Sequence, residues 1–235
     1  MFRWLKKRFG SEGENNCSRR NASQFLDTGF HGDLYLLQLV DTLAKRTSVL
    51  IETGTNVGST LAYFAKRYPL VRCFSCEPDE SAYSLARKHT ENLENVSIFR
   101  GTSQQFMANL ITNESWVFSE QCMFWLDAHG YGFEWPLKDE LEFITRHFNS
   151  GYILVDDFKV PGREDFIYDQ YLEHVCSYDY VKDALNPDRT YQLFYPSYRD
   201  KTSRHHPLCG WGLLIFGHED FSVPDILMDR MERKL

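Results

Sequence analysis

The chain has 235 residues, a length that suits one α/β domain, and its 43% hydrophobic and 25% charged residues are typical of a soluble protein. The formal net charge of -7 argues against general binding to nucleic-acid phosphates. No apolar run approaches the ~18 residues of a transmembrane span, so we expect a cytoplasmic protein that forms a single domain over residues 1–235.

The N-terminal part is polar and irregular, and we expect residues 1–25 to form an extension outside the folded part. Its start, "MFRWLKKRFG", mixes basic and apolar side chains, a combination compatible with peripheral contact to an anionic membrane surface. A frayed or docked terminal helix is the simpler interpretation. The stretch is too short and too charged for a signal peptide.

The rest of the chain alternates between helical and strand patterns. Helical spacing of apolar residues, or a capped polar start, predicts helices over residues 30–46, 58–68, 79–92, 103–112 and 137–148. Short apolar runs predict strands over 48–53, 71–77, 95–101, 122–127 and 151–157. Residues 166–178 are expected to be helical, and 189–198 and 210–220 to form two last strands. This order predicts a mostly parallel sheet with helices on both faces.

The cysteines give no sign of a metal site or a disulfide framework. Six are scattered along the chain, and Cys73 and Cys76 form a C-x-x-C inside a strand-like run without a second close pair. We therefore expect buried, unpaired thiols.

A glycine-containing turn, "IETGTNVGST" at residues 51–60, joins the first strand to its helix. Gly54 and Gly58 allow tight backbone geometry and close approach of a ligand to the amides at the helix N-terminus. The spacing is neither the G-x-G-x-x-G dinucleotide fingerprint nor a P-loop, which argues against an NAD-type oxidoreductase.

Polar residues follow each of the later strands. Glu77 ends the second strand and Ser103 and Gln104 follow the third, whereas the fourth ends at Asp127 and the fifth at Asp156 and Asp157. Open α/β sheets bind ligands at this carboxyl edge, where an acid such as Glu77 can accept hydrogen bonds from ribose hydroxyls.

These motifs resemble the class I S-adenosylmethionine (SAM)-dependent methyltransferases over about residues 48–162. "VLIETGTNVGST" resembles their first motif and "CEPDE" the acidic loop after their second strand. "GTSQQF", "FWLDAH" and "ILVDDFKVPG" are similar to segments of the catechol O-methyltransferase group and its relatives that methylate sugar hydroxyls. The resemblance implies a Rossmann-like fold, a seven-stranded sheet with an antiparallel last strand, and SAM bound by Glu52, Gly54, Thr55, Asn56, Gly58, Ser59, Glu77, Ser103, Gln104 and Asp127.

In the catechol group the acids after the fourth and fifth strands bind Mg²⁺, which implies that Asp127, Asp156 and Asp157 would be the ligands here. Magnesium prefers hard oxygen ligands and could lower the pKa of a bound hydroxyl. This chain departs from the family, which has Asn in place of Asp157 and a lysine base where Gly130 stands here. Beside Asp127, the nearest catalytic candidate for the base is His129, with His205 and His206 as rivals.

The resulting expectation is a SAM-dependent O-methyltransferase, magnesium-assisted, that acts on a hydroxyl of a small acceptor such as a sugar, a natural product or a catechol-like ring. Residues 133–137, "FEWPL", could form one wall of the acceptor site, or simply a helix start at Pro136. "SCEPDE" also resembles a metal-independent branch, in which the acidic pair orients the acceptor. A non-catalytic SAM-binding module is a further alternative.

Overall fold

The computed structural model describes residues 29–128, 135–198, 208–218, 221 and 231–233. The expected N-terminal extension lies outside the described residues, as do His129, Phe133, His205 and His206.

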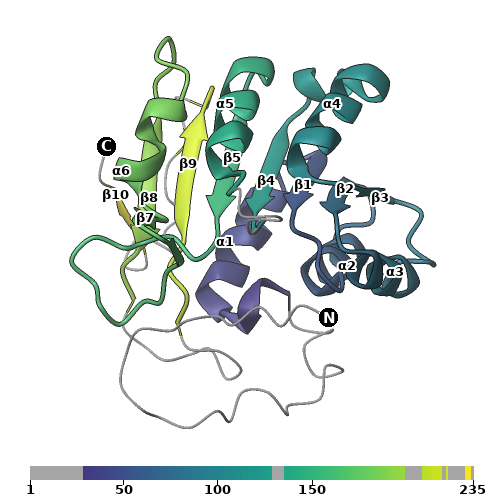
Figure 1. Cartoon of the computed structure of the whole chain (residues 1–235), viewed down its shortest axis with the longest axis horizontal. Helices are drawn as coiled ribbons and strands as arrows, with labels where there is room; N and C mark the ends of the chain where they lie inside the picture. Colours follow the sequence, from purple (N-terminus) through teal and green to yellow (C-terminus); the bar gives the residue numbers. More distant parts are fainter. Residues whose placement is uncertain (1–28, 129–134, 199–207, 219–220, 222–230, 234–235) are drawn as a thin grey trace, which may run out of the picture.

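One mixed sheet runs through the molecule, with its strands in the order β10-β8-β9-β5-β4-β1-β2-β3 (Figure 1). Strands β1 to β5 are mutually parallel, and β9 is antiparallel to both of its neighbours, β5 and β8. The bounds are β1 Val49–Thr53, β2 Arg72–Glu77, β3 Val96–Arg100, β4 Cys122–Leu126, β5 Gly151–Val155, β8 Gln192–Pro196, β9 Gly212–Phe216 and β10 Met231–Arg233. The predicted seven-stranded sheet with an antiparallel last strand is confirmed, and the short β10 extends it at one edge.

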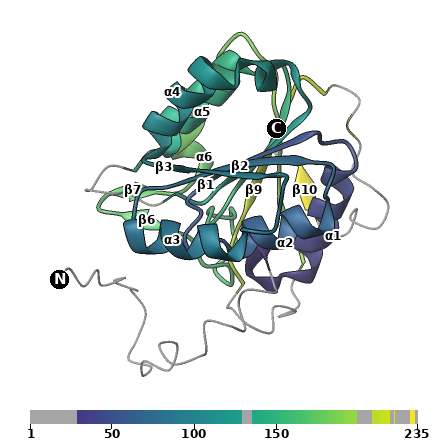
Figure 2. The same ribbon diagram turned by 90° about the vertical axis from the view of Figure 1, so that its right-hand side faces the viewer.

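Helices cover both faces of this sheet (Figure 2). One face carries α1, α2 and α3, and the other carries α4, α5 and the single-turn α6. Their bounds are α1 Leu34–Ala44, α2 Ser59–Arg67, α3 Glu80–His89, α4 Ser103–Asn113, α5 Leu137–His147 and α6 Tyr178–Val181, with 3₁₀ turns η2 Phe30–Gly32, η3 Ser115–Ser119 and η4 Lys182–Ala184. Because both faces are covered, every residue of β1, β4, β5 and β9 is buried.

Side-chain hydrogen bonds satisfy the first amides of three helices, α1, α3 and α4. Asp33 accepts from the amides of Tyr35 and Leu36 at the start of α1, and Asp79 accepts from Ala82 at the start of α3. At α4, Thr102 and Gln105 form a reciprocal capping box. These caps fix the residues that lead from strand to helix.

A helix was predicted for residues 166–178, and this prediction is wrong. The segment instead contains a hairpin of β6 Gln170–Tyr171 and β7 His174–Val175, followed by α6. The backbone of Asp169 bonds to Asp157 and Cys176, and Ile167 pairs with Cys209. These tertiary hydrogen bonds replace the i→i−4 bonds that a helix would need.

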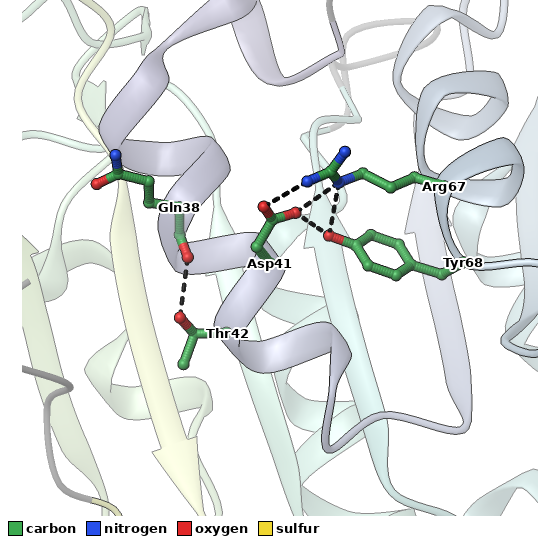
Figure 3. A network of polar contacts seen from close by, with 5 residues as sticks. All are labelled: Gln38, Asp41, Thr42, Arg67 and Tyr68. Carbon is green, nitrogen blue, oxygen red and sulfur yellow. Dashed lines mark hydrogen bonds and ion pairs between the residues drawn. The ribbon is translucent and has the colours of Figure 1, made fainter. Parts of the chain in front are cut away.

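Helix α1 is tied to the end of α2 by a polar cluster (Figure 3). The Arg67 guanidinium donates two hydrogen bonds to the carboxylate of Asp41, at 2.8 and 2.7 Å, and the Tyr68 hydroxyl donates to the same group. Bidentate pairing of this kind has a defined geometry. It links α1, which follows the turn η2, to the end of α2.

Two further expectations can be compared with the described residues. Among the described residues, Cys73, Cys76, Cys122, Cys176 and Cys209 form no disulfide, and all but Cys209 are buried. Within the described part of the chain, the helices are too short or too polar for any to cross a membrane.

Candidate functional site

The first five strands bring their polar ends to one edge of the sheet, because they run parallel to one another. The turn η2 and the start of α1 lie at the same edge, where the arrows of β1 and β4 end in Figure 1. We call this the carboxyl edge.

The glycine turn after β1 packs directly against the end of β4. Gly54 has a φ of +81°, and a Cβ atom there would overlap the carbonyl oxygen of Asp127. Asn56 and Gly58 also have positive φ, at +50° and +83°. Glycine is needed at Gly54 for both reasons, conformation and close approach.

Glu52 lies beneath this turn and is only 1% exposed. The Ser75 hydroxyl donates to its carboxylate at 2.5 Å, and the Thr55 hydroxyl bonds to Ser75. Burial, only partly offset by the Ser75 bond, raises the pKa of Glu52 to about 8. Glu52, one of the predicted cofactor residues, therefore lies inside the fold, where it supports the glycine turn through Ser75 and Thr55.

Glu77 stands at the end of β2 and organises the loop around it. Its two carboxylate oxygens accept from the backbone amides of Asn56, at 2.7 Å, and Asp79, at 2.9 Å. Each carboxylate oxygen can accept more than one hydrogen bond, so the group can still receive a ligand hydroxyl.

The other predicted cofactor residues lie where two helices begin. Ser59 is the first residue of α2, and Ser103 is the buried first residue of α4. Gln104 is exposed and donates to Asp139 on α5 at 3.1 Å. The structure thus brings the predicted SAM-binding residues to the starts of α2 and α4 and the ends of β1 and β2.

Asp127, Asp156 and Asp157, which we call the acid cluster, lie together after β4 and β5. The chain turns at Asp157, whose φ of +47° is uncommon for a residue with a side chain. Burial and the charges of Asp156 and Asp157 raise the pKa of Asp127 well above its ordinary value. Burial and the neighbouring Asp156 and Asp169 raise that of Asp157 to about 7. Asp127 and Asp157 therefore hold protons more tightly than isolated carboxyls do.

His31 contacts the acid cluster and was missed by sequence reasoning. Its Nε2 lies 2.6 Å from Oδ2 of Asp156, across 125 residues of chain. Burial of the imidazole disfavours its charged form, but the charge and hydrogen bond of Asp156, with Asp157 and Asp33 nearby, raise its pKa to about 9. In "GFHGD" nothing periodic marks His31, so the sequence carries no signal for this contact.

A small cleft, with a volume of about 10 Å³, lies beside the acid cluster. Asp127, Asp156 and Asp169 line it together with Trp135 and Leu137. The two apolar residues belong to the segment that was predicted to form an acceptor wall.

Aromatic rings extend this wall. The ring of Trp135 stacks on Tyr180, with centroids 4.9 Å apart, and meets Tyr171 at 5.0 Å. The Tyr171 hydroxyl donates to Asp169. These rings and carboxyl groups give the surroundings of the cleft both apolar faces and oxygen acceptors.

The residues of the carboxyl edge fit SAM, whereas the residues of the acid cluster do not fit Mg²⁺. The bare turn at Gly54, the start of α2 and the carboxylate of Glu77 suit a nucleoside-containing ligand such as SAM. The described side chains of the acid cluster do not fit Mg²⁺, because His31 bonds to one oxygen of Asp156 and Asp127 hydrogen-bonds to Asp156 directly. Within the ranges that the structure describes, no group of three or more His, Cys, Asp or Glu is arranged to hold a metal ion. The magnesium prediction is not confirmed.

Comparison with solved structures gives the fold. An O-methyltransferase from Bacillus cereus in complex with S-adenosylhomocysteine (SAH) superposes with a TM-score of 0.54 at 15% identity, covering 84% of this chain and 82% of that one. The chain has the class I methyltransferase fold. An O-methyltransferase of tomaymycin synthesis from Streptomyces achromogenes, in complex with SAM, has a TM-score of 0.53 at 15% identity, covering 84% and 81%.

At this identity the likeness establishes the methyltransferase fold alone. No family model matches the sequence, and no curated protein does. Within the methyltransferase fold, the motifs that carried the resemblance lie where the resemblance implies, at the ends of β1 to β5.

Proposed function

We propose that the protein is a SAM-dependent O-methyltransferase that acts on a hydroxyl of a small acceptor such as a sugar, a natural product or a catechol-like ring. The observation that carries this proposal is the contact between Gly54 and the Asp127 carbonyl. It joins the glycine turn, which suits a nucleoside, to the acid-lined cleft, which suits a hydroxylated molecule.

Bound SAM would supply an electrophilic methyl group on a sulfonium. The glycine turn, Glu77, and Ser103 and Gln104 would hold it, with Glu77 accepting from the ribose hydroxyls. Asp127 lies between this region and the cleft, so it is placed to serve both.

The residues of the cleft would bind and orient the acceptor. Trp135 and Leu137 offer apolar faces, whereas Asp127, Asp156 and Asp169 offer oxygen acceptors for hydroxyl groups. Asp127 lines the cleft, and we assign it the role of taking the proton of the acceptor hydroxyl as it is methylated. His129, which lies outside the described residues, stays a predicted base.

Because the described side chains of the acid cluster do not fit Mg²⁺, magnesium assistance is not part of the proposed function. The contact between His31 and Asp156 favours the metal-independent alternative, in which the acidic pair orients the acceptor. The acid-lined cleft also favours an enzyme over a non-catalytic SAM-binding module.

The test is methyl transfer from labelled SAM to a panel of sugars, phenolic natural products and catechols, with Asp127→Asn as the comparison. We expect label in at least one acceptor, and a loss of about 10²-fold or more with Asp127→Asn if Asp127 takes the proton. Absence of transfer to every acceptor, together with absence of SAH binding, would contradict the proposal.

A further inference from the structure

We propose that the His31 side chain, through its contact with Asp156, occupies the acid cluster from within the chain, in the place that a divalent cation would take. In this role His31 is a positioning residue, which holds Asp156 in place without touching the substrate. The acid cluster belongs to the proposed methyltransferase site, but the cation-binding experiment does not depend on that function.

The contact between His31 and Asp156 is short and largely buried. The Asp156 side chain is 2% exposed and that of His31 is 24% exposed, and their atoms lie 2.6 Å apart. A buried carboxylate needs a hydrogen-bonded partner, because its desolvation is otherwise costly. Asp156 also lies beside Asp127 and Asp157, so the need is greater here.

The placement of His31 requires an unfavourable, left-handed backbone conformation. Phe30, His31 and Gly32 have φ values of +56°, +57° and +66°, and left-handed residues with side chains persist only where their surroundings enforce them.

The neighbours of His31 enforce the turn. The fully buried Phe30 ring packs edge-on against Trp125, at 4.9 Å, and against Tyr63 and Phe64. On the other side, Asp33 caps α1 and accepts from the hydroxyl of Tyr198. Both flanks of His31 are thus anchored, which holds the imidazole over Asp156.

Replacement of His31 by Asn would remove the imidazole that contacts Oδ2 of Asp156. Carboxylates that share a site repel one another, and the repulsion favours either protonation or capture of a cation. Oxygen ligands of this kind suit Mg²⁺ and Mn²⁺, whereas an imidazole is a poor ligand for Mg²⁺. His31→Asn should therefore create a cation site that the native chain lacks.

The experiment titrates Mn²⁺ into the full-length protein and follows the electron paramagnetic resonance signal of the unbound ion. His31→Asn is the test variant, because Asn tolerates positive φ. His147→Asn is the control, because His147 is exposed at the end of α5, at the opposite edge of the sheet. We expect His31→Asn to bind one Mn²⁺ at least about tenfold more tightly than the native protein and the control, with Mg²⁺ competing.

Two results would overturn the inference. One is stoichiometric, sub-millimolar Mn²⁺ binding by the native protein, which decides the question even if His31→Asn fails to fold. The other is a folded His31→Asn variant that binds Mn²⁺ no better than the native chain. Calorimetry with SAH on the native protein is run in parallel, so that a failure of SAH binding, which counts against the proposed function, is distinguished from a failure of the cation result.

Discussion

At the scale of single residues, the site depends on positions where a side chain is excluded or where an acid is buried with its proton. Gly54 belongs to the first kind, because the backbone of Asp127 occupies the space that a Cβ would need. Glu52 belongs to the second, because its carboxyl lies under the glycine turn at 1% exposure. The role of each residue can be tested by its own substitution with a matched control.

Gly54→Ala should be strongly destabilising. The Cβ meets backbone atoms of Asp127 and Ala128, which no side-chain rotation can relieve, and φ is positive, so we expect a loss of about 2–5 kcal/mol in the free energy of unfolding. Gly162 also has positive φ, but a Cβ there meets nothing within 4 Å, so Gly162→Ala should cost only about 1–2 kcal/mol. Urea denaturation measures both, and equal losses would argue against the packing role of Gly54.

Glu52→Gln should change how stability depends on pH. The folded protein keeps the Glu52 proton up to about pH 8, whereas the unfolded chain loses it near the ordinary value of 4.5. The folded state binds more protons in this window, so raising the pH through it lowers the free energy of unfolding, by at most about 1.4 kcal/mol per pH unit.

The amide in Glu52→Gln carries no such proton, so the stability of this variant relative to the native protein should rise between pH 5 and 8. Denaturation curves at several pH values measure this, with Glu91→Gln, an exposed glutamate, as the control. Native and Glu52→Gln profiles that stay parallel across the window would show that the Glu52 carboxyl titrates normally.

At the scale of elements, helix starts position the side chains expected at the cofactor. Thr102 and Gln105 hold the first turn of α4, which carries Ser103 and Gln104. Thr102→Ala should lower the free energy of unfolding by about 1 kcal/mol, because one amide of the first turn loses its acceptor. Thr112→Ala, exposed near the end of the same helix, should change stability by less than about 0.5 kcal/mol. Chemical denaturation that finds equal effects would argue against the cap.

The elements also show where sequence reasoning works. The strands β1 to β5 and the helices between them could be predicted, because apolar runs and helical spacing are local signals. Residues 166–178 could not, because the backbone of Asp169 is satisfied by Asp157 and Cys176, which are set by the tertiary fold. The helix at residues 30–46 was predicted, but its true start at Leu34 depends on the left-handed turn that places His31.

At the scale of the whole molecule, parallel strands explain why predicted site residues from distant parts of the chain lie at one edge. The sequence order of alternating strands and helices was enough to predict this convergence for Glu77, Asp127 and Asp156. It was not enough for His31, whose partner is 125 residues away and on another element. Pairing of that kind follows from the complete fold rather than from any local pattern.

The central claim is that the carboxyl edge binds the methyl donor. Calorimetry with SAH tests it most directly, with NAD as the competing ligand and Glu77→Gln as the variant. We expect one SAH per chain for the native protein, no binding of NAD, and affinity at least about tenfold weaker for Glu77→Gln, because a charge-assisted hydrogen bond to the ribose is weakened. A native protein that does not bind SAH, or that binds NAD instead, would contradict the account.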